Sequence, residues 1–153
     1  MKKFFLTVIV AFCSIAVLAQ NKINRVSPEE KLNEEYCTGL FKSSEGTILD
    51  MLSKPGASTY FNILDWLDGR VSGLRIYKSR TGTSLPFIRG QQASVYVDEM
   101  PVNASYLSSL PVSEIAMIKI IKSPFLGGFN GGGGAIAIYT IGPEEEVVEE
   151  DGR

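Results

Sequence analysis

Residues 117–140 read MIKIIKSPFLGGFNGGGGAIAIYT and carry the clearest strand pattern of the chain. Isoleucines flank Lys119 at a period of two, and the same kind of alternation returns in AIAIYT at residues 135–140. β-Branched and aromatic residues at this period favour strands. The stretch therefore predicts two strands joined by a glycine-rich loop, with Lys119 facing away from Ile118 and Ile120.

The segments before this stretch alternate between short strands and short helices. Period-two patterns predict strands at 74–78, 85–89 and 95–97, and Asp98-Glu99 is expected to form a turn before the chain resumes at Val102. Helical patterns are found at 48–52, 59–67, 104–110 and 111–115. The fold class expected is α+β, a small mixed β-sheet with short helices.

The helix expected at 59–67 provides the largest group of apolar side chains. Phe61, Ile63, Leu64, Trp66 and Leu67 fall near one face at helical spacing, and Gly69 follows where a C-terminal glycine belongs. Trp66 is expected to anchor the core; a ligand-stacking role is the alternative.

The chain divides into four regions by composition. Residues 1–19 combine Lys2-Lys3 with an apolar run and a small-residue cleavage site, which predicts a secretory signal peptide; an uncleaved anchor is the alternative. Residues 20–46 are polar, with one capped helix expected at 28–36 and too few apolar residues to dock strongly. Residues 47–141 are expected to form the compact domain, and 142–153 an acidic disordered tail.

Charge and composition exclude several classes of function. Residues 20–143 carry 12 basic and 11 acidic side chains. Binding to nucleic acid needs a clustered basic surface, so no nucleic-acid partner is expected. The chain has no histidine, which removes the usual catalytic base and the commonest zinc ligand. No enzymatic activity, cofactor or metal is therefore expected.

Two remaining motifs have structural interpretations. The glycine run ends in Gly134-Ala135-Ile136 and opens a strand, whereas nucleotide-binding glycine loops open a helix. Cys37 is the one cysteine left after signal cleavage, so it cannot form an intramolecular disulfide; a buried bystander role is favoured over a reactive thiol.

Six phrases in order resemble the plug domain of TonB-dependent outer-membrane receptors, especially the SusC-like branch. They cover residues 63–140 and are Leu67–Leu74, Ile88-Arg89-Gly90, Val97–Val102, Ser113-Glu114-Ile115, Ile120–Pro124 and Phe129–Thr140. The second of these matches the isoleucine-arginine-glycine phrase of the family. In the third, Glu99 replaces the turn glycine of the family pattern. No TonB box is recognised, and no barrel sequence follows Thr140, so transport by this chain alone is not expected.

The resemblance implies an exported module at the periplasm or the periplasmic face of the outer membrane. Its partner would be an outer-membrane β-barrel or another envelope protein. Arg89 would face that partner, or alternatively pin a local turn. The residues expected to form a partner-binding or structural motif are Arg89, Gly90, Asp98, Gly131, Gly132, Gly133 and Gly134. The alternative function is binding of a small periplasmic ligand (a glycan, peptide or siderophore) through loops 79–84 and 122–134.

Overall fold

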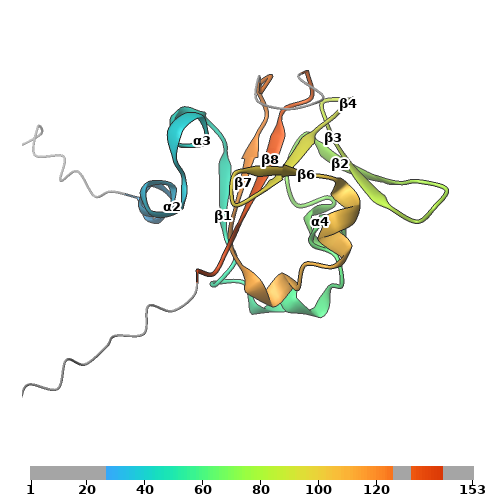
Figure 1. Ribbon diagram of the computed structural model, residues 1–153, viewed down its shortest axis with the longest axis horizontal. Coiled ribbons are helices and arrows are strands. Elements are labelled where there is room, and N and C mark those ends of the chain that lie inside the picture. Colours follow the sequence, from blue (N-terminus) through green and yellow to red (C-terminus); the bar gives the residue numbers. More distant parts are fainter. Residues whose placement is uncertain (1–26, 126–131, 143–153) are drawn as a thin grey trace, which may run out of the picture.

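The computed structural model describes residues 27–125 and 132–142, and the chain forms two β-sheets there (Figure 1). The predicted signal peptide, most of the acidic tail and Gly131 lie outside these ranges. The larger sheet has the strand order β1-β7-β8-β5-β6, and the smaller has the order β2-β3-β4. The strands are β1 (Thr47–Asp50), β2 (Leu74–Lys78), β3 (Ser84–Ile88), β4 (Gln91–Gln92), β5 (Ser94–Val97), β6 (Met100–Val102), β7 (Ile115–Ile121) and β8 (Ala135–Thr140).

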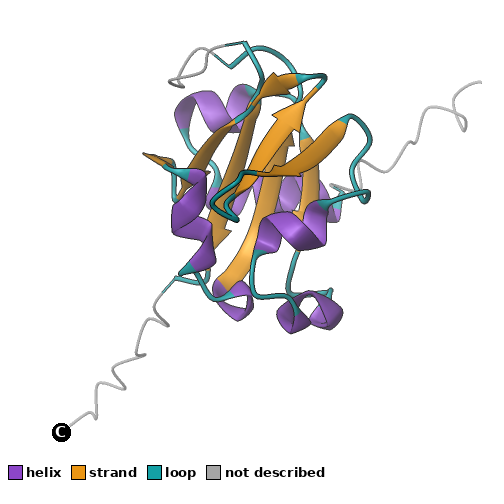
Figure 2. Ribbon diagram, turned by 90° about the vertical axis from the view of Figure 1, so that its right-hand side faces the viewer, coloured by secondary structure: helices purple, strands orange, loops and turns teal. Residues whose placement is uncertain are grey.

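The larger sheet is mixed because β5 pairs with β8 in parallel, while its other pairs are antiparallel. Short helices cover it on both sides (Figure 2). The α-helices are α2 (Pro28–Tyr36), α3 (Gly39–Ser43) and α4 (Ile63–Leu67), and the 3-10 helices are η1 (Pro55–Thr59), η2 (Ala104–Ser108) and η3 (Val112–Glu114). The α+β class with a small mixed sheet is confirmed.

The main core lies on the face of the larger sheet that α4 covers, called here the first face. Trp66 is 6% exposed within this core, so its anchoring role is confirmed. Asn62 caps α4 by accepting the N–H of Leu64 at 2.9 Å. The expected place of Phe61 in the core was wrong: its side chain is 97% exposed, because the helix begins only at Ile63.

Residues 47–50 form a strand where a helical turn was expected. β1 pairs antiparallel with β7, so that Ile48 lies opposite Lys119 and Leu49 opposite Ile118. A run of four residues is too short for periodicity to separate a helix from a strand, and pairing with the sheet decides it here. The helix prediction for this segment was therefore wrong.

The opposite face of the larger sheet, called here the second face, is also covered. Residues 28–43, named here the N-terminal arm, contain α2 and α3, which lie beside β1 (Figure 1). They bring Cys37 and Phe41 into a buried cluster with Tyr96 and Tyr139. Lys119 faces away from the first face as predicted, yet it is only 2% exposed because the arm lies over it. The predicted capped helix 28–36 is present as α2, and the segment that follows it supplies the buried anchors.

Within residues 27–125 and 132–142, no helix has the length and apolar character needed to span a membrane.

Candidate interaction site at the glycine rim

Arg89 and Gly90 form the two-residue turn between β3 and β4. Their φ angles are 53° and 84°, and Ile88 pairs with Gln91 across the turn. Positive φ at both positions is typical of the type I′ turn, in which the second position favours glycine. The N–H of Arg89 also donates to the carbonyl of Gly73 at 2.9 Å, which fixes the turn against the start of β2.

The glycine loop that enters β8 packs directly on this hairpin. A Cβ atom built on Gly133 would lie 2.0 Å from the carbonyl oxygen of Gln92, and one on Gly134 would lie 2.3 Å from that of Ile121. Gly132 comes equally close to the side chain of Gln91. Gly133 and Gly134 are therefore required for close backbone approach, whereas the Gln91 side chain could move away from Gly132. β4 lies beside the ends of β7 and β8 (Figure 1).

Residues 89–92 and 132–134 together make a continuous edge, called here the glycine rim. The Arg89 side chain is exposed on it, and within the described ranges no ion pair or side-chain hydrogen bond involves its guanidinium. A guanidinium presents donors that suit a carboxylate on another molecule. The rim thus holds a cation on a rigid turn and directs it to solvent.

Asp98 lies at the other end of β5 and is not part of the rim. Its carboxylate accepts the N–H of Thr140 at 2.9 Å and the hydroxyl of the same residue at 2.8 Å. Asp98 and Glu99 have φ angles of 46° and 64°, so they form the central pair of the β5–β6 hairpin. The structure brings Arg89, Gly90 and Gly132–Gly134 together, and it gives Asp98 a local role.

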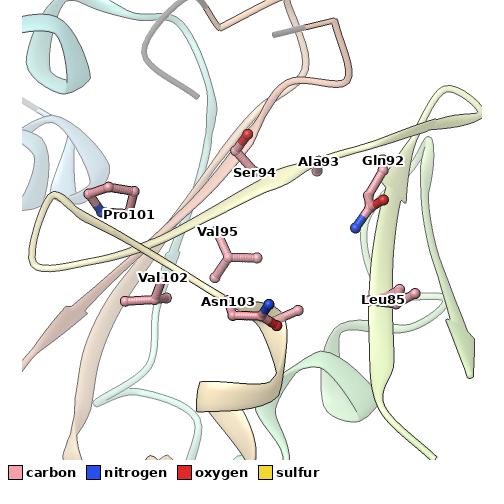
Figure 3. A pocket seen from close by; sticks show the side chains of 9 residues that line it. Leu85, Gln92, Ala93, Ser94, Val95, Pro101, Val102 and Asn103 are labelled. Carbon is pink, nitrogen blue, oxygen red and sulfur yellow. The ribbon is translucent and has the colours of Figure 1, made fainter. Parts of the chain in front are cut away.

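A half-open cavity of about 350 Å³ lies between β3–β4 and β5–β6 (Figure 3). Its floor is apolar, with Leu85, Val95 and Val102, and the carboxamides of Gln92 and Asn103 stand at its sides. None of its lining residues belongs to loops 79–84 or 122–134, which were the predicted ligand-binding segments. Sequence reasoning missed this cavity because it forms between two sheets that no local pattern relates.

Cys37 and Glu99 complete the set of notable polar residues. Burial raises the pKa of the Cys37 thiol above its ordinary value, which disfavours the thiolate that a reactive cysteine needs. Glu99 accepts hydrogen bonds from Thr38 and Tyr139, a role that the sequence signalled only through its replacement of the family's turn glycine. Among the described residues, no group of three or more acidic or cysteine side chains is placed to hold a metal.

Comparisons with known proteins identify solved structures that share this fold. The chain superposes on the RagAB peptide importer (TM-score 0.53, 17% identity, 65% of this chain and 12% of the other). It also superposes on the siderophore receptor PirA from Acinetobacter baumannii (0.51, 19%, 76% and 19%). A third match is the ferric enterobactin receptor PfeA from Pseudomonas aeruginosa, as the R480A/Q482A mutant (0.51, 17%, 71% and 18%). No curated protein matches the sequence.

The chain thus corresponds to less than a fifth of the length of these three receptors. Identities below 20% establish the shared fold. The family model for the TonB-dependent receptor plug domain matches residues 55–135, which include the β3–β4 turn and the whole glycine rim. This match spans more than half of the 153 residues, so the chain belongs to the TonB-dependent receptor plug domain family.

Proposed function

We propose that this chain is an exported, non-enzymatic interaction module of the Gram-negative cell envelope, and that its glycine rim contacts a partner protein. Membership of the plug family supports an envelope location. The observation that carries the proposal is Arg89, an exposed cation on a turn fixed by Gly73 and by the glycine loop. The partner proposed is an outer-membrane β-barrel or another envelope protein with a carboxylate facing Arg89.

Charge reversal at the rim tests this proposal. The tagged chain would be incubated with detergent-solubilised outer membranes, as wild type, Arg89→Glu and Arg89→Lys. Wild type is expected to retain an envelope protein that Arg89→Glu loses by at least about tenfold, because a charge-assisted hydrogen bond becomes a repulsion. Arg89→Lys keeps the charge without the bidentate geometry, so intermediate retention is expected.

Arg75 provides the matched control. It is exposed on β2, outside the rim, and belongs to the same small sheet. Arg75→Glu changes the net charge by the same amount and is expected to retain the partner as wild type does. Equal loss in both variants would reduce the effect to net charge, and capture that is unchanged by Arg89→Glu would refute the rim as the contact.

A second candidate function is binding of a small ligand in the cavity between the sheets. The cavity is at the lower end of ligand-site volumes and has no charged lining residue. Two carboxamides over an apolar floor suit a neutral ligand with hydroxyl or amide groups, such as a glycan or peptide, better than an anionic siderophore. This candidate uses residues distinct from Arg89.

Thermal shift with neutral glycans, short peptides and siderophores tests the cavity. A shift of at least about 2 °C is expected for one neutral class. Gln92→Ala should abolish it, because the variant removes one of the two carboxamides. Gln91→Ala removes the neighbouring carboxamide outside the cavity and should keep the shift. A flat screen, or a shift insensitive to Gln92→Ala, would exclude this function.

A further inference from the structure

The second face of the larger sheet would present a broad apolar surface without the N-terminal arm. Its buried residues are Tyr96, Met117, Ile121, Phe125, Ala135, Ala137 and Tyr139. The arm covers them with Cys37, which is 2% exposed, and with Phe41, which is 8% exposed and packs its ring against Tyr96 and Phe125. The partly buried Leu32 and Tyr36 of α2 also pack on this face, Tyr36 beside Tyr139. Leu40, between these anchors, is 53% exposed. Cys37 and Phe41 are therefore the two apolar side chains of the arm that are buried, and the other apolar contacts of the arm are partly exposed.

Two charged residues of the sheet hold the two ends of α3. At its N-terminal end, the Glu99 carboxylate accepts the N–H of Thr38 at 2.5 Å and also the Thr38 hydroxyl. At its C-terminal end, Lys119 Nζ donates to the carbonyl of Phe41 at 2.6 Å. An anion at the N-terminus and a cation at the C-terminus complement the helix dipole. The sheet thus fixes both the position and the direction of this short helix.

The backbone conformation of Glu99, whose carboxylate binds Thr38, is strained. Glu99 has a φ of 64°, a left-handed conformation that disfavours residues with a Cβ by about 1 kcal/mol. The plug-family pattern has glycine at this position, where the strain is absent. Glu99 therefore strains its turn, and the hydrogen bonds of its carboxylate with Thr38 and Tyr139 offset this strain.

Burial of the Lys119 ammonium group also destabilises the closed position of the arm. It is 2% exposed, and burial lowers the pKa of its ammonium group. Its side-chain hydrogen bonds go to Phe41 O and, at 2.5 Å, to Asn33 Oδ1, which both belong to the arm. If the arm leaves, water replaces both acceptors and rehydrates the charge. Rehydration of Lys119 therefore offsets part of the cost of opening.

The backbone of the arm is separate from the sheet. Its backbone–backbone hydrogen bonds within the described residues, such as Cys37 N to Asn33 O and Ser44 N to Leu40 O, stay inside the arm and its C-terminal end. Residues 44–46 then connect it to β1. Opening would leave every strand pair of the larger sheet intact, as expected of a locally unfolding unit.

We propose that the N-terminal arm is a latch, which opens about residues 44–46 as a local unit and exposes the second face while both sheets stay folded. Glu99 and Lys119 determine the equilibrium between the closed and the open arm. The proposal is independent of the partner that we propose for the glycine rim, because it concerns the other end of β5 and needs no partner for its test.

Cys37 reports the latch directly, because it belongs to the arm and its side chain is buried against the second face while the arm is closed. All variants would carry Cys13→Ser, so that Cys37 is the one cysteine. Labelling by excess aromatic disulfide would be followed at several urea concentrations below the unfolding transition. Wild type is expected to label through an opening that depends weakly on urea, and much faster than global unfolding allows.

Glu99→Gly is the decisive variant. It restores the turn glycine and removes two hydrogen bonds to Thr38, so Cys37 should label at least about tenfold faster while the melting temperature stays level or rises. Lys119→Met should also speed labelling, because it leaves the carbonyl of Phe41 and Oδ1 of Asn33 without their donor in the closed arm, and this loss outweighs the relief of removing the buried charge. Glu99→Gln keeps one of the two acceptor oxygens that Thr38 uses and should fall between wild type and Glu99→Gly.

Glu114→Ala is the control, since Glu114 is exposed on η3, outside the arm and its turn partners, and is like Glu99 an acidic residue. It should label as wild type does. The latch is refuted if Cys37 reacts only at the rate of global unfolding in wild type. It is equally refuted if neither Glu99→Gly nor Lys119→Met accelerates the reaction.

Discussion

Gly133 packs its backbone against the carbonyl of Gln92, and this contact leaves no room for a side chain. A Cβ atom there would lie 2.0 Å from a backbone oxygen, which cannot rotate away. Its φ lies outside the left-handed region, so steric exclusion alone makes glycine necessary. The glycine run, which resembles a phosphate-binding loop in sequence, is thus a packing device between two sheets.

Gly133→Ala should therefore destabilise the fold by about 1–3 kcal/mol, as overpacking does elsewhere. Urea unfolding followed by circular dichroism would measure the change. Gly56→Ala is the matched control, because a Cβ on Gly56 meets nothing within 4 Å and its φ is ordinary. That variant should be neutral or slightly stabilising. Equal effects in the two variants would contradict the packing role.

Cys37 makes a separate contribution to the pH dependence of stability. Burial raises the pKa of its thiol above the ordinary 9.0, so above pH 9 the unfolded chain loses this proton more readily than the folded chain. The thiol therefore makes its full contribution to the free energy of unfolding below pH 9, and this contribution is lost as the pH rises above 9. Lys119 acts in the opposite direction, because burial lowers its pKa.

Comparison of wild type with Cys37→Ala isolates the thiol, since both retain Lys119. The stability advantage of wild type should be constant from pH 7 to 8. It should then shrink between pH 9 and 10, by no more than about 1.4 kcal/mol per pH unit. Urea unfolding at each pH gives the two curves. If the free energies of unfolding of wild type and Cys37→Ala differ by the same amount at every pH in this range, burial does not raise the pKa of the thiol.

At the scale of elements, Pro101 protects the free edge of the larger sheet. The N–H groups of Ser94 and Asp98 point towards β8, so Val95 and Val97 direct theirs to β6. Pro101 lies opposite Tyr96, so its backbone nitrogen and carbonyl point away from β5. They face the open edge of the sheet, because β6 is the terminal strand. Because proline has no N–H, this edge offers no donor there to an added strand.

Pro101→Val should open the edge to pairing with a second molecule. The variant is expected to self-associate at concentrations at which wild type stays monomeric, with monomer stability changed by less than about 1 kcal/mol. Analytical ultracentrifugation would measure this. Met100→Val alters the same exposed strand but retains Pro101, so it should behave as wild type. Association of both variants would assign the effect to side-chain apolarity instead.

Sequence reasoning succeeded where local chemistry decides the element. Strands β2, β5, β7 and β8 follow from period-two patterns, and α2 follows from its capping box. It failed for β1, because pairing with β7 determines four ambiguous residues, and for Phe61, because the helix starts after it. In the candidate site, Arg89, Gly90 and the glycines came from the family resemblance, while the cavity needed the arrangement of two sheets.

At the scale of the whole molecule, the larger sheet carries two cores of different extent. Strands β7 and β8 form its centre, and β7 is buried along its entire length. The first face packs on α4 and the 3-10 helices, whereas the second face is covered by the arm and by Phe125, which follows β7. The smaller sheet is more exposed, especially along β2. Stability should therefore be graded across the fold.

Hydrogen exchange under native conditions would measure this gradation. Amides of β7 and β8 are expected to exchange only through global unfolding, because each is covered on both faces. Amides of the arm and of the β2–β3 turn should exchange at lower free energy and with weaker urea dependence. Glu99→Gly should accelerate the arm and leave β7 unchanged. If the arm instead exchanges together with β7 and β8, then the two faces unfold as one unit, and the larger sheet requires its N-terminal cover to be stable.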